Sequence, residues 1–213
     1  MPDIAIGWGE VVSLIVSGVL VGFINTLAGG GSIISLSILM FLGLPAPVAN
    51  GTNRIAILVQ TATAVGSFRQ QKVLDYRKGL LLAIPAVVGA VIGAYIAVDI
   101  NEKIFERAMA VIMLLMLIFI LYNPKKWLYG KKELQERKVG YREIMIFFGI
   151  GIYGGFIHMG VGYLLLASLL LGIGYDLVRA NAVKVMIVML YIPFSLAVFL
   201  INDQVNWAYG LIL

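Results

Sequence analysis

The stretch Gly22-Phe23-Ile24-Asn25-Thr26-Leu27-Ala28-Gly29-Gly30-Gly31-Ser32 ends an apolar segment with three consecutive glycines. A related stretch, Gly155-Phe156-Ile157-His158-Met159-Gly160-Val161-Gly162-Tyr163, lies in the second part of the chain. Each glycine costs about 1 kcal/mol relative to alanine in a helix interior, so three in a row end the helix. The sequence therefore predicts a broken helix at corresponding places in two halves.

The composition is that of an integral membrane protein, because 61% of the residues are hydrophobic, only 13% are charged and the mean hydropathy is +0.98. Gly79–Val98, Ile104–Leu121 and Val178–Leu200 approach or exceed the roughly 20 apolar residues that cross a bilayer as a helix. These runs are continuous rather than alternating, which favours helices over membrane strands. We expect an all-α polytopic membrane protein. The chain has no cysteine, which excludes disulfides and thiol chemistry.

The two halves align at a constant spacing of 131 residues. This spacing pairs Gly29 with Gly160, Gly31 with Gly162, Gly43 with Gly174, Asn50 with Asn181, Asn53 with Lys184, and Gly79 with Gly210. We expect a first transmembrane repeat over residues 1–122, a basic linker over 123–141 and a second repeat over 142–213. Gly79 is followed by two apolar spans and Gly210 by three residues only, so we expect the second repeat to be truncated and the intact protein to continue beyond Leu213.

Basic residues gather in two polar segments, 69–78 and 123–142, separated by two apolar spans. Short loops rich in Lys and Arg stay cytoplasmic, which places both segments in the cytoplasm and the acidic N-terminus outside. This topology explains the net charge of +5 without a nucleic-acid partner. Counting spans from an outer N-terminus, the first half has an odd number, so the second half is inverted relative to it.

The glycine breaks point to an anion. A helix that begins at Ser32 presents unpaired N–H groups and the positive end of its dipole, and broken backbone in a membrane lines a cavity or is buried. Close helix packing is the competing explanation of the glycines. Polar and cationic side chains accompany the breaks, and the candidate binding residues are Asn25, Gly29, Gly30, Gly31, Ser32, Asn50, Thr52, Asn53, Arg54, Gly160, Gly162, Asn181 and Lys184.

Lys184 lies about 9 Å into its apolar segment at the helical rise of about 1.5 Å per residue, and no acidic residue lies within one turn. Arg54 also has no carboxylate near it in sequence. Such cations indicate that a ligand or distant residues supply negative charge, unless the side chains extend to the membrane surface. His158 is the only histidine; it is a candidate proton carrier or a packing residue. No cluster suited to a metal ion and no cofactor motif is present, so we expect neither metal nor cofactor.

With these residues in place, the chain resembles the sulfite exporter TauE/SafE family of membrane permeases. The resemblance rests on the first glycine stretch, on Ala49-Asn50-Gly51-Thr52-Asn53 and on Arg179-Ala180-Asn181-Ala182-Val183-Lys184. It implies an inner-membrane carrier with two repeats that moves sulfite or organosulfonate anions. Two departures leave the anion open: Ser35 stands where many members have a proline, and the second stretch lacks a triple glycine.

We therefore expect a secondary transporter of a small sulfur-containing oxyanion that works by alternating access and is not an enzyme. The bilayer and the anion are its expected partners, and its oligomeric state is open. A carrier of metal cations is disfavoured because at most two acidic residues lie near the ends of the spans. The alternatives are an intramembrane hydrolase, which requires His158 in contact with Ser32 or Ser168, and a non-transporting membrane assembly partner, which would tolerate Lys184→Ala.

Overall fold

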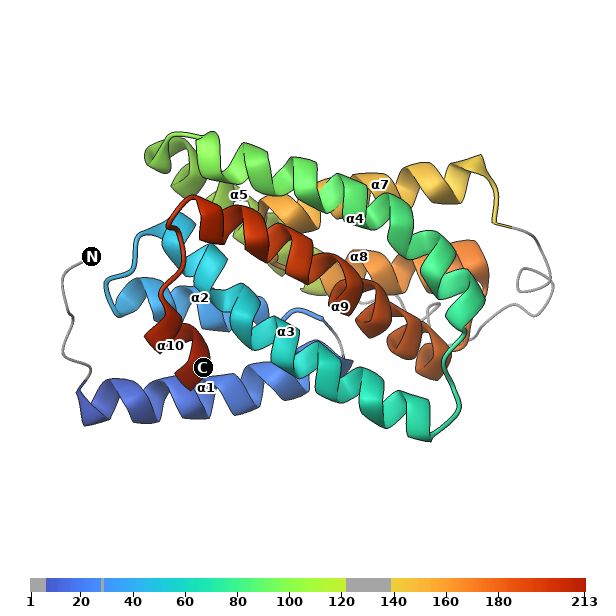
Figure 1. Ribbon diagram of the computed structural model, residues 1–213, viewed down its shortest axis with the longest axis horizontal. Helices are drawn as coiled ribbons and strands as arrows, with labels where there is room; N and C mark the ends of the chain where they lie inside the picture. Colours follow the sequence, from blue (N-terminus) through green and yellow to red (C-terminus); the bar gives the residue numbers. More distant parts are fainter. Residues whose placement is uncertain (1–6, 28, 122–138) are drawn as a thin grey trace.

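The computed structural model describes residues 7–27, 29–121 and 139–213, without the side chains of 116–121 (Figure 1). All regular structure in this part of the chain is helical. The elements in order are α1 (Trp8–Leu27), α2 (Ser32–Phe41), α3 (Ala46–Gln70), α4 (Tyr76–Asp99), α5 (Glu102–Leu121), α7 (Tyr141–Phe156), α8 (Val161–Ala167), the π-helix η2 (Ser168–Ile173), α9 (Leu177–Ile201) and α10 (Trp207–Ile212).

Three of these helices, α1, α4 and α9, are long and apolar enough to cross a membrane. Two shorter apolar segments, α2 and the combined α8 and η2, follow the glycine stretches. The expectation of an all-helical membrane protein is confirmed for the described residues. Most of the expected linker 123–141 lies outside them, as do residues 1–6.

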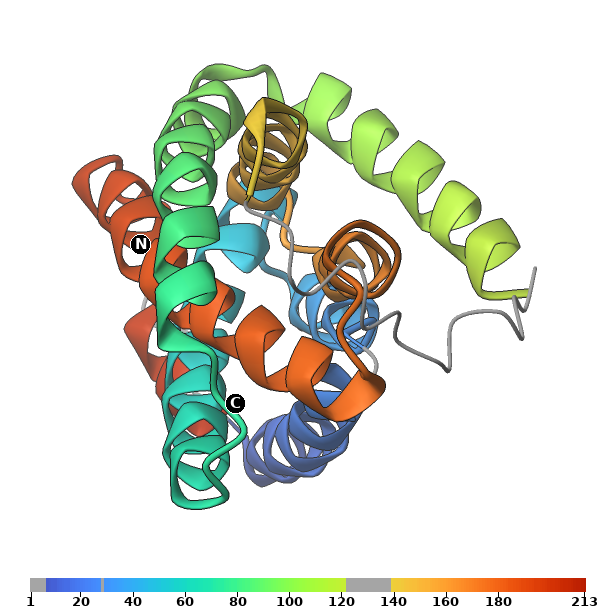
Figure 2. The ribbon, with the colours of Figure 1, turned by 90° about the vertical axis from the view of Figure 1, so that its right-hand side faces the viewer.

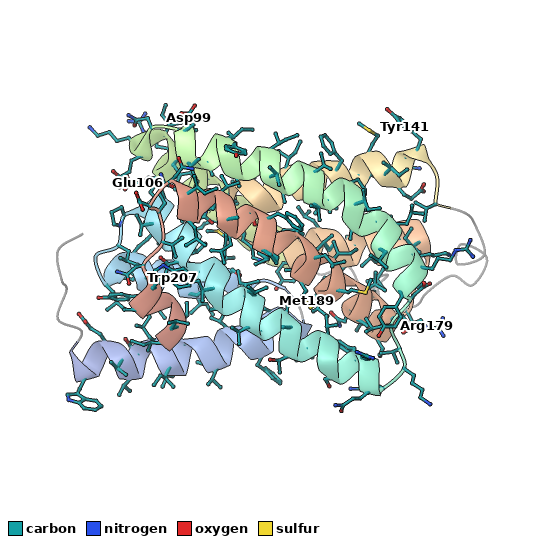
Figure 3. The ribbon with its side chains drawn as sticks, in the orientation of Figure 1. Asp99, Glu106, Tyr141, Arg179, Met189 and Trp207 are labelled. Atoms are coloured by element: carbon teal, nitrogen blue, oxygen red, sulfur yellow. The ribbon has the colours of Figure 1, made fainter. Side chains whose placement is uncertain are left out.

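The helices run between two ends of the molecule. One end carries the loop between α3 and α4 and the starts of α7 and α9; we call it the basic end (Figure 1). Its described charged residues are Arg69, Lys72, Arg77, Lys78, Arg142 and Arg179, with Asp75, Glu143 and Asp176. Asp99 and Glu106 lie at the opposite, acidic end, and Arg179 and Tyr141 lie at the basic end (Figure 3).

The two broken helices enter the molecule from opposite ends. Helix α1 starts at the acidic end and stops in the interior, where α2 begins and returns to the acidic end (Figure 1). Helix α7 starts at the basic end and also stops in the interior, and α8 and η2 return to the basic end. Helices α3 and α9 then run the full length in opposite directions. Each half therefore contributes one pair of helix ends to the middle of the fold.

Backbone conformation recurs at the 131-residue spacing. The described residues with positive φ fall into three pairs: Gly29 (92°) with Gly160 (68°), Gly43 (90°) with Gly174 (83°), and Lys72 (56°) with Asp203 (55°). Two helix starts recur at the same spacing, Ala46 with Leu177 and Tyr76 with Trp207. Left-handed backbone is uncommon for residues other than glycine, so its recurrence at Lys72 and Asp203 reflects a shared turn geometry.

Helix α7 packs tightly against α4 (Figure 2). A Cβ atom at Gly89 or Gly93 of α4 would collide with the backbone of α7, and one at Gly151 or Gly155 with the backbone of α4. Small residues allow membrane helices to approach this closely. The interface fixes the end of α7, which is part of the candidate site.

Candidate functional site

The two glycine stretches meet in the centre of the molecule. A Cβ atom added to Gly29 would overlap the Cα of Gly162, and one added to Gly162 would overlap the Cα of Gly29. A Cβ at Gly30 would overlap the ring of Tyr163. Glycine is required here because the backbones of the two halves touch, and the positive φ of Gly29 adds a conformational reason.

Lys184 holds the end of α1. It is buried, and its Nζ donates to the carbonyl oxygens of Asn25 (3.0 Å) and Thr26 (3.1 Å) and to Oδ1 of Asn181 (2.8 Å). Three acceptors match the three N–H donors of an ammonium group. The last carbonyls of a helix lack partners within it and carry its negative dipole end, so a cation there is stabilised.

Arg54 holds the end of α7 in the same way. Its side chain is fully buried and donates from Nη1 to the carbonyl of Gly154 (3.2 Å) and to Oγ of Ser195 (2.8 Å), and from Nη2 to the carbonyl of Gly155 (2.6 Å). Asn50 adds a bond from Nδ2 to the carbonyl of Phe156 (2.9 Å). The end of each broken helix is therefore bound by a side chain from the other half.

Within the described part of the chain, these two cations have no buried counter-charge. The buried polar side chains in the described residues include Arg54 and Lys184 but neither Asp nor Glu. The acceptors of both cations are neutral carbonyl, amide and hydroxyl oxygens. Isolated charges are costly inside a membrane, and these neutral oxygens are the groups that compensate the two cations here.

A small cavity lies beside the point where Gly29 and Gly162 meet. It is bordered by Asn25, Gly29, Ile57, Gln60, Thr61, His158, Gly162, Lys184, Val185 and Val188. The centre of a water molecule can occupy about 20 Å³ of it, which is room for about one water molecule. A group larger than a water molecule fits this cavity only if the surrounding helices move apart.

The start of α2 is satisfied from within the chain. Asn25 accepts from the backbone N–H of Ser32 (3.2 Å) and donates to Oγ of Ser32 (3.2 Å) and Oε1 of Gln60 (3.3 Å). The N–H of Ile34 donates to the carbonyl of Gly31 (2.9 Å). An anion at this helix start must replace the Asn25 contact, which differs from the expectation of unpaired donors at Ser32.

Asn53 has no hydrogen-bond partner within the described structure. It is 1% exposed, and both its Oδ1 and its Nδ2 lack a partner, as do Oδ1 of Asn50 and Nε of Arg54. Buried amides are nearly always paired. Asn53 shares a face of α3 with Ile57 and Gln60, which border the cavity.

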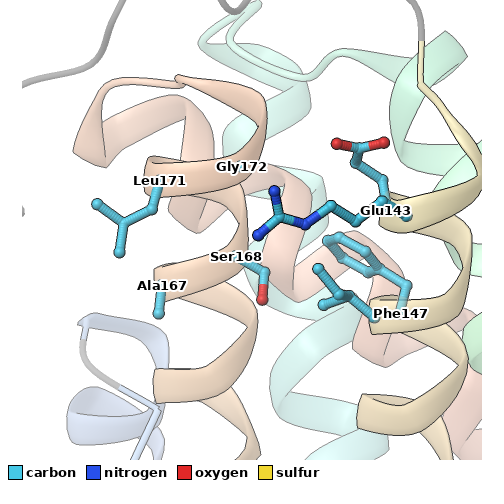
Figure 4. A pocket seen from close by; sticks show the side chains of 8 residues that line it. Glu143, Phe147, Ala167, Ser168, Leu171 and Gly172 are labelled. Carbon is cyan, nitrogen blue, oxygen red and sulfur yellow. The ribbon is translucent and has the colours of Figure 1, made fainter.

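His158 borders the cavity, and its Nδ1 is 2.9 Å from the hydroxyl of Tyr191. Ser32 is bonded to Asn25. Ser168 lines a separate groove of about 340 Å³ between α7 and the α8–η2 segment, beside Phe147 and Leu171 (Figure 4). The His158 contact that an intramembrane hydrolase requires is therefore not formed with either serine in this structure.

Of the candidate residues, the cavity is bordered by Asn25, Gly29, His158, Gly162 and Lys184. Ser32 and Asn181 are bonded to two of these, Asn25 and Lys184, and Gly30 and Gly31 lie between Gly29 and Ser32 in the chain. Asn50, Asn53 and Arg54 belong to α3, which also supplies cavity residues, and Gly160 precedes the start of α8. Thr52 lies elsewhere: its Oγ1 accepts from the N–H of Asn206, at the start of α10. Gln60 and Thr61, which border the cavity, and Ser195, which binds Arg54, were not among the expected site residues. Gln60 lies two helical turns after Asn53 and therefore on the same face of the helix, which could have marked it as a site residue from the sequence.

Two helices, α1 and α7, end inside an all-helical membrane protein and are bound there by buried cations, which is an arrangement typical of membrane transporters. The chain belongs to the sulfite exporter TauE/SafE family, whose family profile matches residues 14–213. It is 26% identical to a "Probable membrane transporter protein" of Haemophilus influenzae, over 92% of this chain and 76% of that protein. It is 24% identical to the "Probable membrane transporter protein YfcA" of Escherichia coli K12, over 91% and 71%.

A third relative, the "Probable membrane transporter protein YunE" of Bacillus subtilis, is 26% identical over 95% of this chain and 82% of that protein. No solved structure matches the chain. The family and the names of these relatives identify a membrane transporter, in agreement with the expectation from sequence.

Proposed function

We propose that this protein is a secondary transporter of small sulfur-containing oxyanions, sulfite or organosulfonates, across the bacterial inner membrane. The observation that carries the proposal is a pair of buried cations, Lys184 at the wall of the central cavity and Arg54 one helical turn before the cavity residue Ile57, without a buried carboxylate in the described residues. The description of the matched family, a sulfite exporter, supports sulfur oxyanions over other anions.

The binding site in this proposal lies between the halves. Lys184 and Asn181 approach it from α9, Asn50, Asn53 and Arg54 from α3, and the glycine breaks from both sides. Electrostatic attraction is strong where water is excluded. A bound anion would draw on the same donors that hold the ends of α1 and α7, so binding and helix position are coupled.

The transport mechanism in this proposal is alternating access between two inverted repeats, residues 1–122 and 142–213, joined by the linker 123–141. Support comes from the recurrence of backbone angles at the 131-residue spacing and from broken helices that enter from opposite ends. The central contact of Gly29 and Gly162 is the point about which the halves would rock. The small cavity corresponds to a closed state of this cycle.

The proposed orientation places the basic end in the cytoplasm and the start of α1 outside. Basic loops of membrane proteins stay inside, and the loop between α3 and α4 and the start of α7 share the basic end. His158, at the cavity wall, is a proposed site of proton coupling.

Flux assays in proteoliposomes test the proposal. Purified protein is reconstituted, and uptake of sulfite, an alkyl sulfonate, sulfate and chloride is followed. We expect uptake of sulfite and of the alkyl sulfonate, and loss of this uptake in Lys184→Ala and Gly30→Leu. Matched controls are Arg179→Ala, an exposed cation at the start of α9, and Gly66→Leu, where a side chain meets open space. Absence of oxyanion flux, or normal flux in both site variants, contradicts it.

A further inference from the structure

The unpartnered polar atoms of α3 constrain which form of the anion binds. Three of them belong to Asn50 and Asn53, which lie on the same face of the helix as Ile57 and Gln60 at the cavity. Two are amide oxygens, which accept hydrogen bonds, and one is an amide nitrogen, which donates. A ligand that satisfies this face must offer both a donor and an acceptor.

Rearrangement within the protein does not remove this requirement. Nδ2 of Asn50 donates to the carbonyl of Phe156, which fixes Oδ1 of Asn50 as the unpaired atom. If Nδ2 of Asn53 turned to that oxygen, Oδ1 of Asn53 would still lack a donor. A fully deprotonated oxyanion carries only acceptor oxygens, and an unpaired buried acceptor costs about 1–3 kcal/mol.

The centre carries an excess of positive charge. Arg54 and Lys184 contribute two positive charges, and each is bound to the end of a helix, α7 or α1. The partial negative charges of these two helix ends are offset by the partial positive charges at the starts of α2 and α8. An anion is therefore favoured, and the hydrogen-bonding groups of α3 decide which protonation state fits.

We propose that the transported species is a protonated monoanion, which for sulfite is hydrogen sulfite, and that the proton crosses the membrane on the substrate. Its O–H donates to Oδ1 of Asn53, and its anionic oxygens accept from Nδ2 of Asn53 and from the cations of the centre. One transport event moves one H⁺ and one SO₃²⁻ together, with a net charge of −1. This inference rests on the proposed function and specifies the substrate of the same site.

The other titratable groups at the site do not have to carry a proton in this scheme. His158 and Lys184 border the cavity, Tyr191 is bonded to His158, and Arg54 lies on α3. Hydrogen sulfite and sulfite interconvert near neutral pH, so external pH sets the supply of the transported form. This scheme moves the coupled proton from His158, the site named in the proposed function, to the substrate. The pH profile of uptake should therefore keep its shape in His158→Gln, even where the rate falls because a cavity residue is changed.

Initial rates of sulfite uptake into proteoliposomes, measured between pH 6 and 8 at several total concentrations, test the inference. We expect one KM at all pH values when concentration is expressed as hydrogen sulfite. A pH dye inside the vesicles should report acidification, because imported hydrogen sulfite releases part of its protons there, whereas import of the dianion would take up protons and make the interior more alkaline. Methanesulfonate, a monoanion without an O–H, and sulfate, a dianion, should compete at least tenfold more weakly. Protein-free vesicles give the background from sulfur dioxide permeation.

The outcomes separate the two proposals. No sulfite flux or competition at any pH overturns the proposed function itself. Flux with a constant KM for the dianion, or without accompanying protons, overturns only the protonated substrate. Asn53→Leu is expected to raise the KM for hydrogen sulfite at least tenfold. Thr63→Leu, a change of an exposed residue on the same helix, should leave the KM unchanged. An unchanged KM in folded Asn53→Leu protein means that the amide binds only water and also overturns the inference.

Discussion

Arg54 and Lys184 bind equivalent atoms at the ends of two different broken helices. Lys184 donates to the carbonyls of Asn25 and Thr26, the two residues before the last of α1, and Arg54 to those of Gly154 and Gly155, the two before the last of α7. Each cation comes from the half of the chain that does not contain the helix it binds. The position of each broken helix thus depends on the other half.

Lys184→Met should destabilise the protein and abolish transport. The substitution keeps the length of the side chain but leaves the carbonyls of Asn25 and Thr26 and Oδ1 of Asn181 without their donor, at a cost of about 2–4 kcal/mol. Thermal unfolding in detergent and sulfite flux measure the two effects. Arg179→Met, an exposed cation on the same helix, should change neither; equal effects in both variants would refute a specific role of Lys184.

Arg54→Lys tests whether the fork of the guanidinium matters beyond its charge. Nη1 and Nη2 bind different carbonyls, and one ammonium group cannot reproduce this geometry. We expect a loss of about 1–3 kcal/mol of stability, read as a lower unfolding midpoint. Arg69→Lys, at the exposed end of α3, is the matched control and should stay within about 0.5 kcal/mol.

Gly29→Ala and Gly162→Ala should each separate the two breaks. Each new methyl group overlaps the backbone of the other glycine, and at Gly29 the positive φ adds strain of about 1–2 kcal/mol. Because one displacement relieves both overlaps, the double variant should be more stable than the sum of the single effects predicts, by at least about 0.5 kcal/mol. Strict additivity in thermal unfolding would contradict the contact. Gly66→Ala, in open space, should be neutral.

Tyr175→Phe should have an effect on stability that depends on pH. Tyr175 lies between η2 and α9, and its hydroxyl donates to Oδ2 of Asp75 at 2.6 Å. Burial, and then this bond, raise the pKa of Tyr175 above its usual value. A raised pKa stabilises the fold below the unfolded value of about 10, and this contribution falls as the pH rises further.

Unfolding midpoints of the wild type and Tyr175→Phe at pH 8 and pH 11 check this sign. The wild type should be more stable by about 1–2 kcal/mol at pH 8 and by less at pH 11. Tyr141→Phe, which removes an exposed hydroxyl, should show no such change. A difference that grows with pH would contradict the assigned hydrogen bond.

Cysteine labelling tests the proposed orientation directly, because the chain contains no cysteine. Gln71→Cys, in the loop between α3 and α4, should react with a membrane-impermeant maleimide only when the cytoplasmic face is accessible. Asn202→Cys, at the acidic end after α9, should react in intact spheroplasts. The reverse pattern would show that the acidic end faces the cytoplasm.

The sequence allowed prediction of the helix breaks and of the two unusual cations, because triple glycine and ionisable residues in apolar segments are strong local signals. It did not reveal what Arg54 and Lys184 bind, since their acceptors are backbone carbonyls, which every residue has. It also did not reveal that Asn25 occupies the N–H of Ser32, because that contact depends on how the chain folds back at Gly29. Thr52 matched the polar pattern of its neighbours but points to Asn206, since successive helical residues face different directions.

The crossed binding of the helix ends has a consequence for assembly. A half produced without its partner would place Arg54 or Lys184 in the bilayer without the acceptors that bind it, at a cost of about 3 kcal/mol on insertion scales. Neither half is then expected to form a stable insertion product, whereas two separately expressed halves should rescue each other. The two halves are therefore expected to insert and fold as one unit, because each half supplies the cation that binds a helix end of the other.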